Sequence, residues 1–577
     1  MLPHSTSPRL RAAVIALLSI GLLLAVLLII PGGRASNSPL PSWRFDLVAP
    51  SVSITSPAEG ASVAGTISLN VSARDNTAVG LVKLYKDGVL FGQDALPPYT
   101  FLWSTALEPD ASYAFTAVAI DSRGNQATSQ PVQVSVSNPI VSTQPNVVVV
   151  LTDDQRWDTM QYMPLTNSLL YADSVRFTNA IAAVPLCCPS RASILTGLYS
   201  HNHGVKDNIP PYGGAPVFDD SSTIATWLDR AGYRTGLFGK YLNYYYELVP
   251  DRPIPAGWDQ FYAFLNNDGN YYNYSLVENG VTVAYGNQPG DYATDVITDK
   301  AIQFITTANP AEPVFVYLAP FAPHSTTAAP SSYPTPGYGD SGAYAHLSPW
   351  RPASHNEADV SDKPRWVQDL PLLTPAQIET GDQFRIKQLE SLQAVDRAVG
   401  KLVEALVQTG RYENTVFVFL SDNGLSWGEH RWNVKKWCAY EECIRIPFWI
   451  RAPGASGRED DSLVNDVDLA PTLAEFAGAL PPAPLNGASL VDLIEDPLAP
   501  RRLDAYTEYI SPVAGGAKMM FRAVRTSAYF YAEYDNGDRE FYDLSIDPLQ
   551  ELNRASDPRH SQTVSDLQKL LRVLKDE

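Results

Sequence analysis

The 577-residue chain has few basic residues and few cysteines, and both shortages restrict what it can do. Lysine and arginine together number 42 against 62 acidic residues, so the formal net charge is −20. Such a chain has little with which to neutralise a phosphate backbone, and we exclude nucleic acid as a partner. The negative field also disfavours long polyanions, so an anionic ligand must be held by local positive charge. The spacing of the four cysteines suggests no zinc site.

Long apolar runs are also scarce, and the clearest one lies near the N-terminus. Residues 12–30 carry no charge and are mostly apolar, and Arg9 and Arg11 precede them. A helix of this length nearly matches a bilayer core of about 30 Å. We expect residues 1–35 to be either a membrane anchor or a signal peptide that is cleaved near Ala35. Both alternatives place the rest of the chain outside the cytoplasm.

Short strands with alternating polarity follow a Pro/Ser-rich linker at residues 36–49. They fill residues 50–138 and are separated by turn residues. This spacing predicts a β-sandwich of about 90 residues. It resembles a bacterial Ig-like module, for which we favour a spacer role over a contact with glycan or cell wall. A second linker covers residues 139–145.

From residue 146 onwards, apolar strands alternate with helices. A helix is indicated by apolar residues at three- and four-residue steps between Leu389 and Leu406. The strands are apolar throughout, as expected where both faces are covered: residues 147–151, 233–238, 314–318 and 416–420. This order predicts a doubly wound, mostly parallel α/β sheet over residues 146–485. Residues 486–577 are expected to form a small antiparallel α+β subdomain with a closing helix.

Polar side chains suited to chemistry on an oxyanion follow each of these strands. In chain order they are Asp153 and Asp154, Lys240, His324, and Asp422 with Asn423. Each has an ordinary explanation as a helix cap, a turn or a loop residue. Four such coincidences at one sheet edge, where ligands of open α/β sheets bind, indicate a site. Three carboxylates and an amide oxygen suit calcium or magnesium and do not suit zinc or copper.

The segment Cys-Cys-Pro-Ser-Arg at residues 187–191, followed by Leu-Thr-Gly at 195–197, predicts a cysteine at the start of a short helix. Pro189 suits the first helical turn and Gly197 suits the C-terminal cap. A helix N-terminus attracts anions and lowers the pKa of a nearby thiol, and Arg191 adds a planar cation. The alternative is an inert, buried cysteine.

This segment resembles the signature of the type I sulfatases, which belong to the alkaline phosphatase superfamily. In that family a maturation enzyme oxidises the first cysteine, here Cys187, to formylglycine, which becomes the catalytic nucleophile. The resemblance implies a calcium site, with magnesium as second choice, formed by position 187 together with Asp153, Asp154, Asp422 and Asn423. It also implies four further catalytic residues: Lys240 and Lys436 on the sulfate, His324 on the ester oxygen, and Arg191 on the aldehyde hydrate.

Residues 239–243 read Gly-Lys-Tyr-Leu-Asn, where many sulfatases have Gly-Lys-Trp-His. The family's histidine is absent here, and Asn243 is the candidate for part of its role. Together with the motifs at 200–203 and 271–275, this departure resembles the N-acetylglucosamine-6-sulfatase branch. The basic insertion of heparan endosulfatases is missing, which favours small or chain-end sulfated saccharides of the glycosaminoglycan type. Three histidines in motif loops are candidates to line the pocket, with ordinary packing as the alternative: His201, His203 and His430.

Two other functions are alternatives: a phosphoester or phosphonate hydrolase on the same scaffold, and a non-catalytic surface protein that binds glycans. A cysteine and lysines stand where such hydrolases hold a second metal, which favours sulfate monoesters. The full set of required side chains argues against a non-catalytic role. If Cys187 is modified, Cys438 and Cys443 can bridge each other, but the sequence leaves their pairing with Cys188 open.

Overall fold

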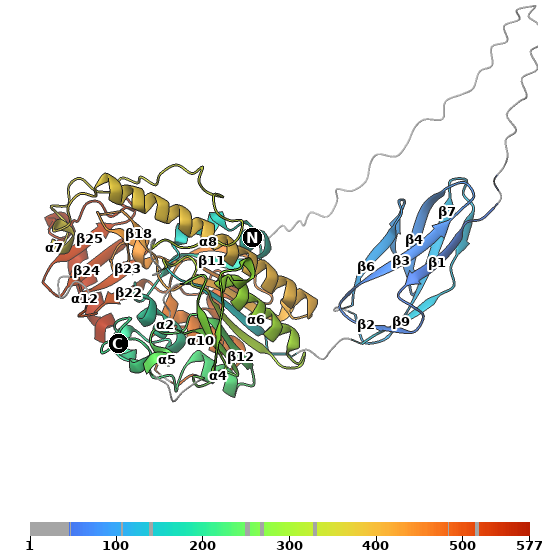
Figure 1. Ribbon diagram of the computed structural model, residues 1–577, viewed down its shortest axis with the longest axis horizontal. Coiled ribbons are helices and arrows are strands. Elements are labelled where there is room, and N and C mark those ends of the chain that lie inside the picture. The colour runs from blue at the N-terminus through green and yellow to red at the C-terminus, as the bar shows by residue number, and fades with distance from the viewer. Residues whose placement is uncertain are drawn as a thin grey trace, which may run out of the picture.

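The computed structural model describes residues 46, 48–105, 108–137, 142–248, 254–265, 270–326, 332–482, 484–513 and 519–576. Figure 1 shows an all-β body and a larger body of strands and helices. The predicted membrane segment at residues 12–30 lies outside the described ranges. No helix within those ranges has the length and apolar character that crossing a membrane requires. We therefore withdraw the assignment of this chain as a membrane protein with a transmembrane helix.

The N-terminal body is a sandwich of two sheets, in agreement with the predicted Ig-like module. Its strands are β1 (Ser51–Ser56), β2 (Ala61–Val63), β3 (Thr66–Arg74), β4 (Val79–Lys86), β5 (Val89–Asp94), β6 (Tyr99–Ser104), β7 (Ser112–Asp121), β8 (Gln126–Thr128) and β9 (Val132–Val136). One sheet has the order β1-β3-β6 and the other β2-β9-β7-β4-β5, with β8 paired to β7. Every second side chain of β6 and β7 is buried, as a two-residue period requires. Leu84, Trp103 and Phe115 form part of the core between the sheets.

The larger body is built on a ten-stranded sheet. Its strands are β10 (Asn146–Thr152), β11 (Ser174–Ile181), β12 (Arg234–Gly239), β13 (Gln260–Phe264), β14 (Ser275–Glu278), β15 (Val281–Ala284), β16 (Val314–Ala319), β17 (Thr415–Ser421), β20 (Phe448–Arg451) and β21 (Arg458–Asn465). The order is β15-β14-β13-β12-β16-β10-β17-β20-β11-β21. The centre from β13 to β17 is parallel, as predicted. Strands β14 and β20 run opposite to the other eight, so the sheet is mixed but mostly parallel, as predicted.

Helices cover both faces of this sheet. The helices that precede the C-terminal part are α1 (Pro164–Leu170), α2 (Cys187–Thr196), α3 (Ser200–His203), α4 (Ile224–Arg230), α5 (Tyr245–Leu248), α6 (Ala293–Thr307), α7 (Arg365–Gln368), α8 (Pro375–Gln408), α9 (Glu441–Ile444), α10 (Leu469–Ala477) and α11 (Val491–Glu495). On β10, Val147 and Val149 pack with residues of α2, α4 and α10, whereas Val148 and Val150 pack with residues of α6 and α8. A strand covered on both faces is apolar throughout, which explains the run of valines.

The C-terminal part forms a four-stranded antiparallel sheet with a closing helix. It comprises β22 (Asp504–Tyr509), β23 (Phe521–Thr526), β24 (Tyr529–Tyr534), β25 (Arg539–Asp543) and α12 (Ser561–Asp576). Its hydrophobic core also includes residues of the larger body, among them Val184, which precedes α2, and Tyr440, which follows β17. A short ribbon, β18 (Ser426–Trp427) with β19 (Asn433–Lys435), precedes a disulfide between Cys438 and Cys443. Cys187 and Cys188 are free.

We expect the N-terminal sandwich to unfold separately from the larger body. Leu84 is fully buried in a core whose members all lie between residues 52 and 136. Leu84→Ala removes buried methyl groups and is expected to lower the free energy of unfolding by about 2–5 kcal/mol. Calorimetry should show one transition moving to lower temperature while the other stays in place. Leu102→Ala, at a site that is 69% exposed, is the control and should move neither. A single transition that shifts as a whole contradicts the expectation.

Candidate active site

The sheet topology brings the predicted polar residues to one edge. Strands β12, β16, β10 and β17 are neighbours and run parallel, so their carboxyl ends lie side by side. Asp153 follows β10, Asp422 follows β17 and Lys240 follows β12, each directly. His324 lies five residues beyond β16. Segments that are up to 270 residues apart in the chain therefore meet at one place.

Four residues at this edge form a buried cluster of possible metal ligands. Each of Asp153, Asp154, Cys187 and Asp422 offers one ligand atom, and these atoms all lie within 4.8 Å of one another. Asn423 donates from Nδ2 to Asp154 Oδ1 at 2.6 Å. The Asn423 Oδ1 atom is buried and accepts no hydrogen bond from any residue that the structure describes. Because the set consists mainly of oxygens and one of them lacks a donor, the residues fit a hard divalent cation.

Cys187 enters the cluster as the first residue of α2. Its Sγ donates to Asp153 Oδ1 at 3.2 Å. The next amide, Cys188 N–H, donates to Asn208 Oδ1 at 2.8 Å, which satisfies one free donor at the helix end. Gly197 ends the helix in the left-handed conformation, at φ 71°, as predicted. Burial, followed by the charge of Asp153, raises the pKa of the Cys187 thiol. The lowering expected from the helix N-terminus is therefore wrong for this buried position.

Three cations face the carboxylates. Lys240 Nζ pairs with Asp153, and Lys436 Nζ lies 2.6 Å from both Asp154 Oδ1 and Cys187 Sγ. Arg191 contributes the third cation: Nε donates to a carboxylate oxygen of Asp422 at 2.9 Å, and Nη1 donates to the Lys240 carbonyl at 3.1 Å. All three side chains are more than nine-tenths buried. The site thus places three buried cations next to a cluster whose possible ligand atoms are mainly oxygens.

The two aspartates nearest the strand ends differ in acidity. Burial acts to raise the pKa of Asp153, but Lys240, His324 and Arg191 overcome this and hold it well below the usual value. Burial raises the pKa of Asp422 to about 6, and the charge of Asp153 adds to the rise. Asp153 is therefore the more strongly ionised of the two.

His324 lies at the border of the cluster, with a side chain that is 21% exposed. Its Nδ1 is 2.6 Å from the Ser325 carbonyl, an oxygen that can only accept, so Nδ1 carries a proton. Its Nε2 is 3.7 Å from Asp154 Oδ2. Tyr271 donates from its hydroxyl to the His324 carbonyl at 2.6 Å and holds the loop. Burial lowers the pKa of His324.

Gln388 on α8 connects three of the loops that carry the site, and the sequence analysis did not single it out. Its Nε2 donates to the Asp154 carbonyl at 3.2 Å and to the Pro323 carbonyl at 3.4 Å. Its Oε1 accepts from Trp427 Nε1 at 2.6 Å. A glutamine four residues before Leu392, on the apolar face of the helix, is the signal that could have found it.

The remaining candidates each contact a residue that is not part of the ligand cluster. Asn243 contacts Cys188 Sγ at 3.4 Å, His201 Nδ1 contacts Glu508 at 2.8 Å, His203 Nε2 contacts Ser193 at 3.0 Å, and His430 Nδ1 contacts Glu357 at 2.7 Å. Burial lowers the pKa of His203 to about 3. His430 also stacks on Tyr440, with ring centroids 3.9 Å apart. The structure therefore gives the three histidines packing and hydrogen-bonding positions and does not bring them to the cluster.

Three family models match this chain. The model described as Sulfatase covers residues 145–479, and the one described as N-sulphoglucosamine sulphohydrolase, C-terminal, covers residues 428–577. A bacterial Ig domain model covers residues 50–117.

The chain is similar to the N-acetylglucosamine-6-sulfatase of Homo sapiens, with 33% identity over 61% of this chain and 64% of that protein. It is similar to the extracellular sulfatase SULF-1 homolog of Drosophila melanogaster, with 32% identity over 62% of this chain and 32% of that protein. The match thus spans less than two thirds of either relative. The chain is also similar to a solved structure of a protein in complex with its substrate, D-glucosamine-2-N,6-O-disulfate. The two folds superpose with a TM-score of 0.63, and the match has 26% identity and covers 75% of this chain and 99% of that chain. Because the sulfatase model matches more than half of the chain, this protein belongs to the sulfatase family, as a type I sulfatase that fits the N-acetylglucosamine-6-sulfatase branch.

Proposed function

We propose that this chain hydrolyses sulfate monoesters on small or chain-end sulfated saccharides, such as N-acetylglucosamine 6-sulfate, outside the cytoplasm. The observation that carries the proposal is the buried ligand cluster, faced by the ammonium groups of Lys240 and Lys436. The names of the human and Drosophila relatives support the sugar and the extracellular location. The substrate named in the similar solved structure supports a sulfated amino sugar.

We infer that the cluster holds a divalent cation, calcium in preference to magnesium. The ligands would be the oxygens of Asp153, Asp154, Asp422 and Asn423 together with the side chain at position 187. When bound, such a cation supplies Lewis-acid polarisation of sulfuryl oxygens and balances the negative charge of the site. The unsatisfied Asn423 oxygen supports this inference, because a buried amide oxygen without a donor is costly.

We also infer that a maturation enzyme converts Cys187 to formylglycine. The modification would supply a hydrated aldehyde as the nucleophile. The Cys187 Sγ occupies the place of the oxygen that would replace it, between Asp153 Oδ1 at 3.2 Å and Lys436 Nζ at 2.6 Å. An oxygen at the Sγ position would therefore contact both the Asp153 carboxylate and the Lys436 ammonium group. Arg191 fixes this end of α2 through its contacts with Asp422 and with the Lys240 carbonyl.

Lys240 and Lys436 would bind the sulfate and balance the charge that develops on its oxygens. Both are buried, and electrostatic contacts act more strongly where water is excluded. His324 would donate a proton to the departing sugar oxygen. Because its Nδ1 proton is engaged by the Ser325 carbonyl, the transferred proton must come from Nε2 of the doubly protonated ring. The carboxylates of Asp153 and Asp154 favour that form, whereas burial disfavours it.

The first test compares sulfate esters with phosphorus esters on the matured enzyme. We expect N-acetylglucosamine 6-sulfate to be turned over faster than N-acetylglucosamine 6-phosphate or a phosphonate monoester. Cys187→Ala should lower turnover by about 10³-fold or more, because it removes the nucleophile. Mass spectrometry of the peptide over residues 183–191 must show the aldehyde, so that failed maturation is not mistaken for lack of activity. Faster turnover of the phosphorus esters, or no sulfate release by aldehyde-bearing protein, would contradict the proposal.

The second test removes the divalent cation. A chelator should abolish turnover and lower Tm, because the three buried carboxylates then lose their shared counter-charge. Calcium should restore both quantities at lower concentration than magnesium. Asn423→Ala should weaken calcium binding by about 10–100-fold, a loss known even for residues that only support a metal ligand. Asn287→Ala, in an exposed loop, is the matched control. If Asn423→Ala binds calcium as tightly as the wild-type chain, Asn423 is not one of the calcium ligands.

The third test concerns Gln388 as a positioning residue. Gln388→Met keeps the length of the side chain but leaves the Trp427 indole N–H and the Asp154 carbonyl without their partner. We expect kcat and calcium affinity to fall by about 10–100-fold, with a smaller change in KM. Gln393→Met, five residues further along α8, removes bonds to the Tyr162 and Leu389 carbonyls and serves as the control. Equal effects of the two variants would show that Gln388 is merely structural.

A further inference from the structure

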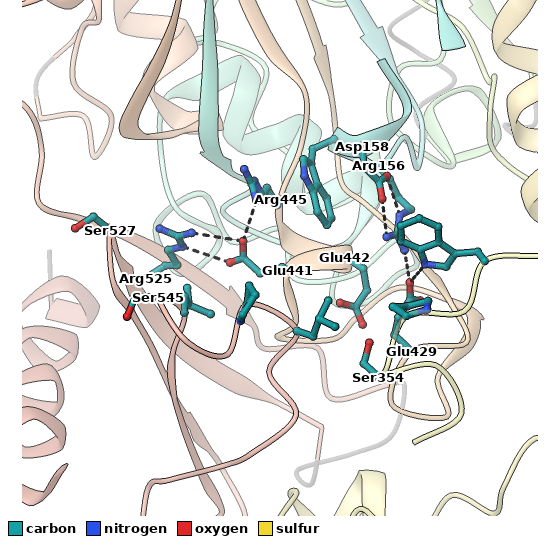
Figure 2. Close-up of a pocket in the computed structure, with 16 residues that line it drawn as sticks. Arg156, Asp158, Ser354, Glu429, Glu441, Glu442, Arg445, Arg525, Ser527 and Ser545 are labelled. Carbon is teal, nitrogen blue, oxygen red and sulfur yellow. Dashed lines mark hydrogen bonds and ion pairs between the residues drawn. The ribbon is translucent and has the colours of Figure 1, made fainter. Parts of the chain in front are cut away.

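A cavity of about 370 Å³ lies apart from the ligand cluster, between the larger sheet's loops and the C-terminal sheet. Figure 2 shows its walls, which come from the segment after β10, the loop before β19, α9 and the segments around β23 and β25. Cys187, Lys240 and Lys436 are not among the lining residues, so this is a different site. Its volume is in the range of pockets that take small organic molecules.

The ionic groups in the wall of this cavity are nearly all paired. Arg156 binds Asp158 at 2.9 Å and Glu429 at 2.8 Å. On the opposite wall, Glu441 is shared by two arginines: Arg525 at 3.3 Å and Arg445 at 3.6 Å. Figure 2 shows these two networks on either side, with Glu442 between them.

Glu442 is the exception among the charged groups of the wall. Its side chain is 91% buried, and its Oε1 accepts no hydrogen bond from any residue in the described ranges. The nearest cationic partner is His430, whose Nε2 is 3.9 Å away and also lacks a hydrogen bond there. Burial raises the pKa of Glu442 to about 7, and the charge of Glu429 adds to the rise. A buried carboxylate oxygen without a donor is costly unless something occupies the space in front of it.

The charge of the wall shows what that occupant should carry. Three arginines face four carboxylates, and Glu442 is the carboxylate left without an arginine. Its positive partner, His430, lies outside the lining at 3.9 Å and is shared with Glu357 at 2.7 Å, so an ammonium group inside the cavity would pair with Glu442 at closer range. The hydroxyl groups of Ser354, Ser527 and Ser545 also line the cavity and can bond to neutral polar groups. Leu544 and Leu549 give apolar surface for the CH groups of a ring.

A metal ion is a poor fit at this place. Within the described ranges, no three potential ligand groups from this wall lie within 4.8 Å of one another. An ammonium group, in contrast, needs only one carboxylate and neighbouring acceptors.

We propose that this cavity is a binding site for a small polyhydroxylated primary amine, of the size of an amino sugar, whose ammonium group pairs with Glu442. Its existence does not depend on the activity proposed above. The Glu442 carboxylate binds the ammonium group, the serine hydroxyls bond to the ring hydroxyls, and the leucines cover the ring.

Glucosamine and glucose are the probes, because they share a ring and differ only at C2, where glucosamine has an ammonium group and glucose a neutral hydroxyl group. We expect calorimetric titration of the full chain to give at least about tenfold tighter binding of glucosamine, as a charge-assisted hydrogen bond implies. Glu442→Gln is nearly isosteric and should bring this ratio close to one without lowering Tm, because it removes a buried charge whose nearest cationic partner is 3.9 Å away. Glu413→Gln, at a side chain that is 86% exposed, should keep the ratio.

A second variant tests the cavity itself. Ser354→Leu fills the space in front of Glu442 and should abolish the binding of glucosamine while leaving the carboxylate in place. The proposal is overturned if the wild-type chain binds no glucosamine up to tens of millimolar, or if the two sugars bind equally. It is also overturned if either Glu442→Gln or Ser354→Leu, folded with the Tm of the wild-type chain, keeps the preference for glucosamine.

Discussion

The active site depends on holding three carboxylates together in a place that excludes water. Asp153, Asp154 and Asp422 are almost fully buried, and like charges at such distances repel strongly where the dielectric constant is low. The sheet imposes the arrangement, because β10 and β17 run in parallel register and deliver their end residues to the same height. A hydrogen bond from the Asp154 N–H to Asp422 Oδ1 connects the loop after β10 to the loop after β17. The carboxylates are thus fixed by the backbone before any ligand arrives.

In the proposed reaction, the cations would solve a second problem, which is to attract an anion to an acidic chain. The net charge of −20 would repel a sulfate ester, but surface charges are screened over about 8–10 Å in physiological salt. Lys240, Lys436 and Arg191 are buried next to the ligand cluster and are not screened in this way. Their field is therefore local and strong, whereas salt weakens the field of the surface charges beyond that distance. This contrast fits a small sulfated group better than a long polyanion.

The sequence predicted the parts of the site that follow from strand periodicity and from short motifs. Apolar runs marked the four central strands, and the residues after them fell at one edge because parallel neighbours end together. The sequence could not show that Gln388 faces inward to three loops, because helical periodicity identifies a face but not its hydrogen bonds. It gave the wrong direction for the pKa of Cys187, since burial outweighs the helix terminus. It could not place His201, His203 and His430, whose partners lie up to about 300 residues away.

The ligand cluster and the Glu442 cavity are built on the same loops, so neither is mechanically independent of the other. Arg156 lies two residues after Asp154, and its Nη1 donates to the Leu425 carbonyl, two residues after Asn423. Gly424 lies against α9 so closely that a Cβ atom there would be 2.2 Å from the Glu442 carbonyl. Any shift of the Glu442 backbone must therefore be taken up by the residue next to Asn423. If a ligand that moves α9 changes the affinity of the ligand cluster for a cation, thermodynamic reciprocity requires that the cation change the affinity of the cavity by the same factor.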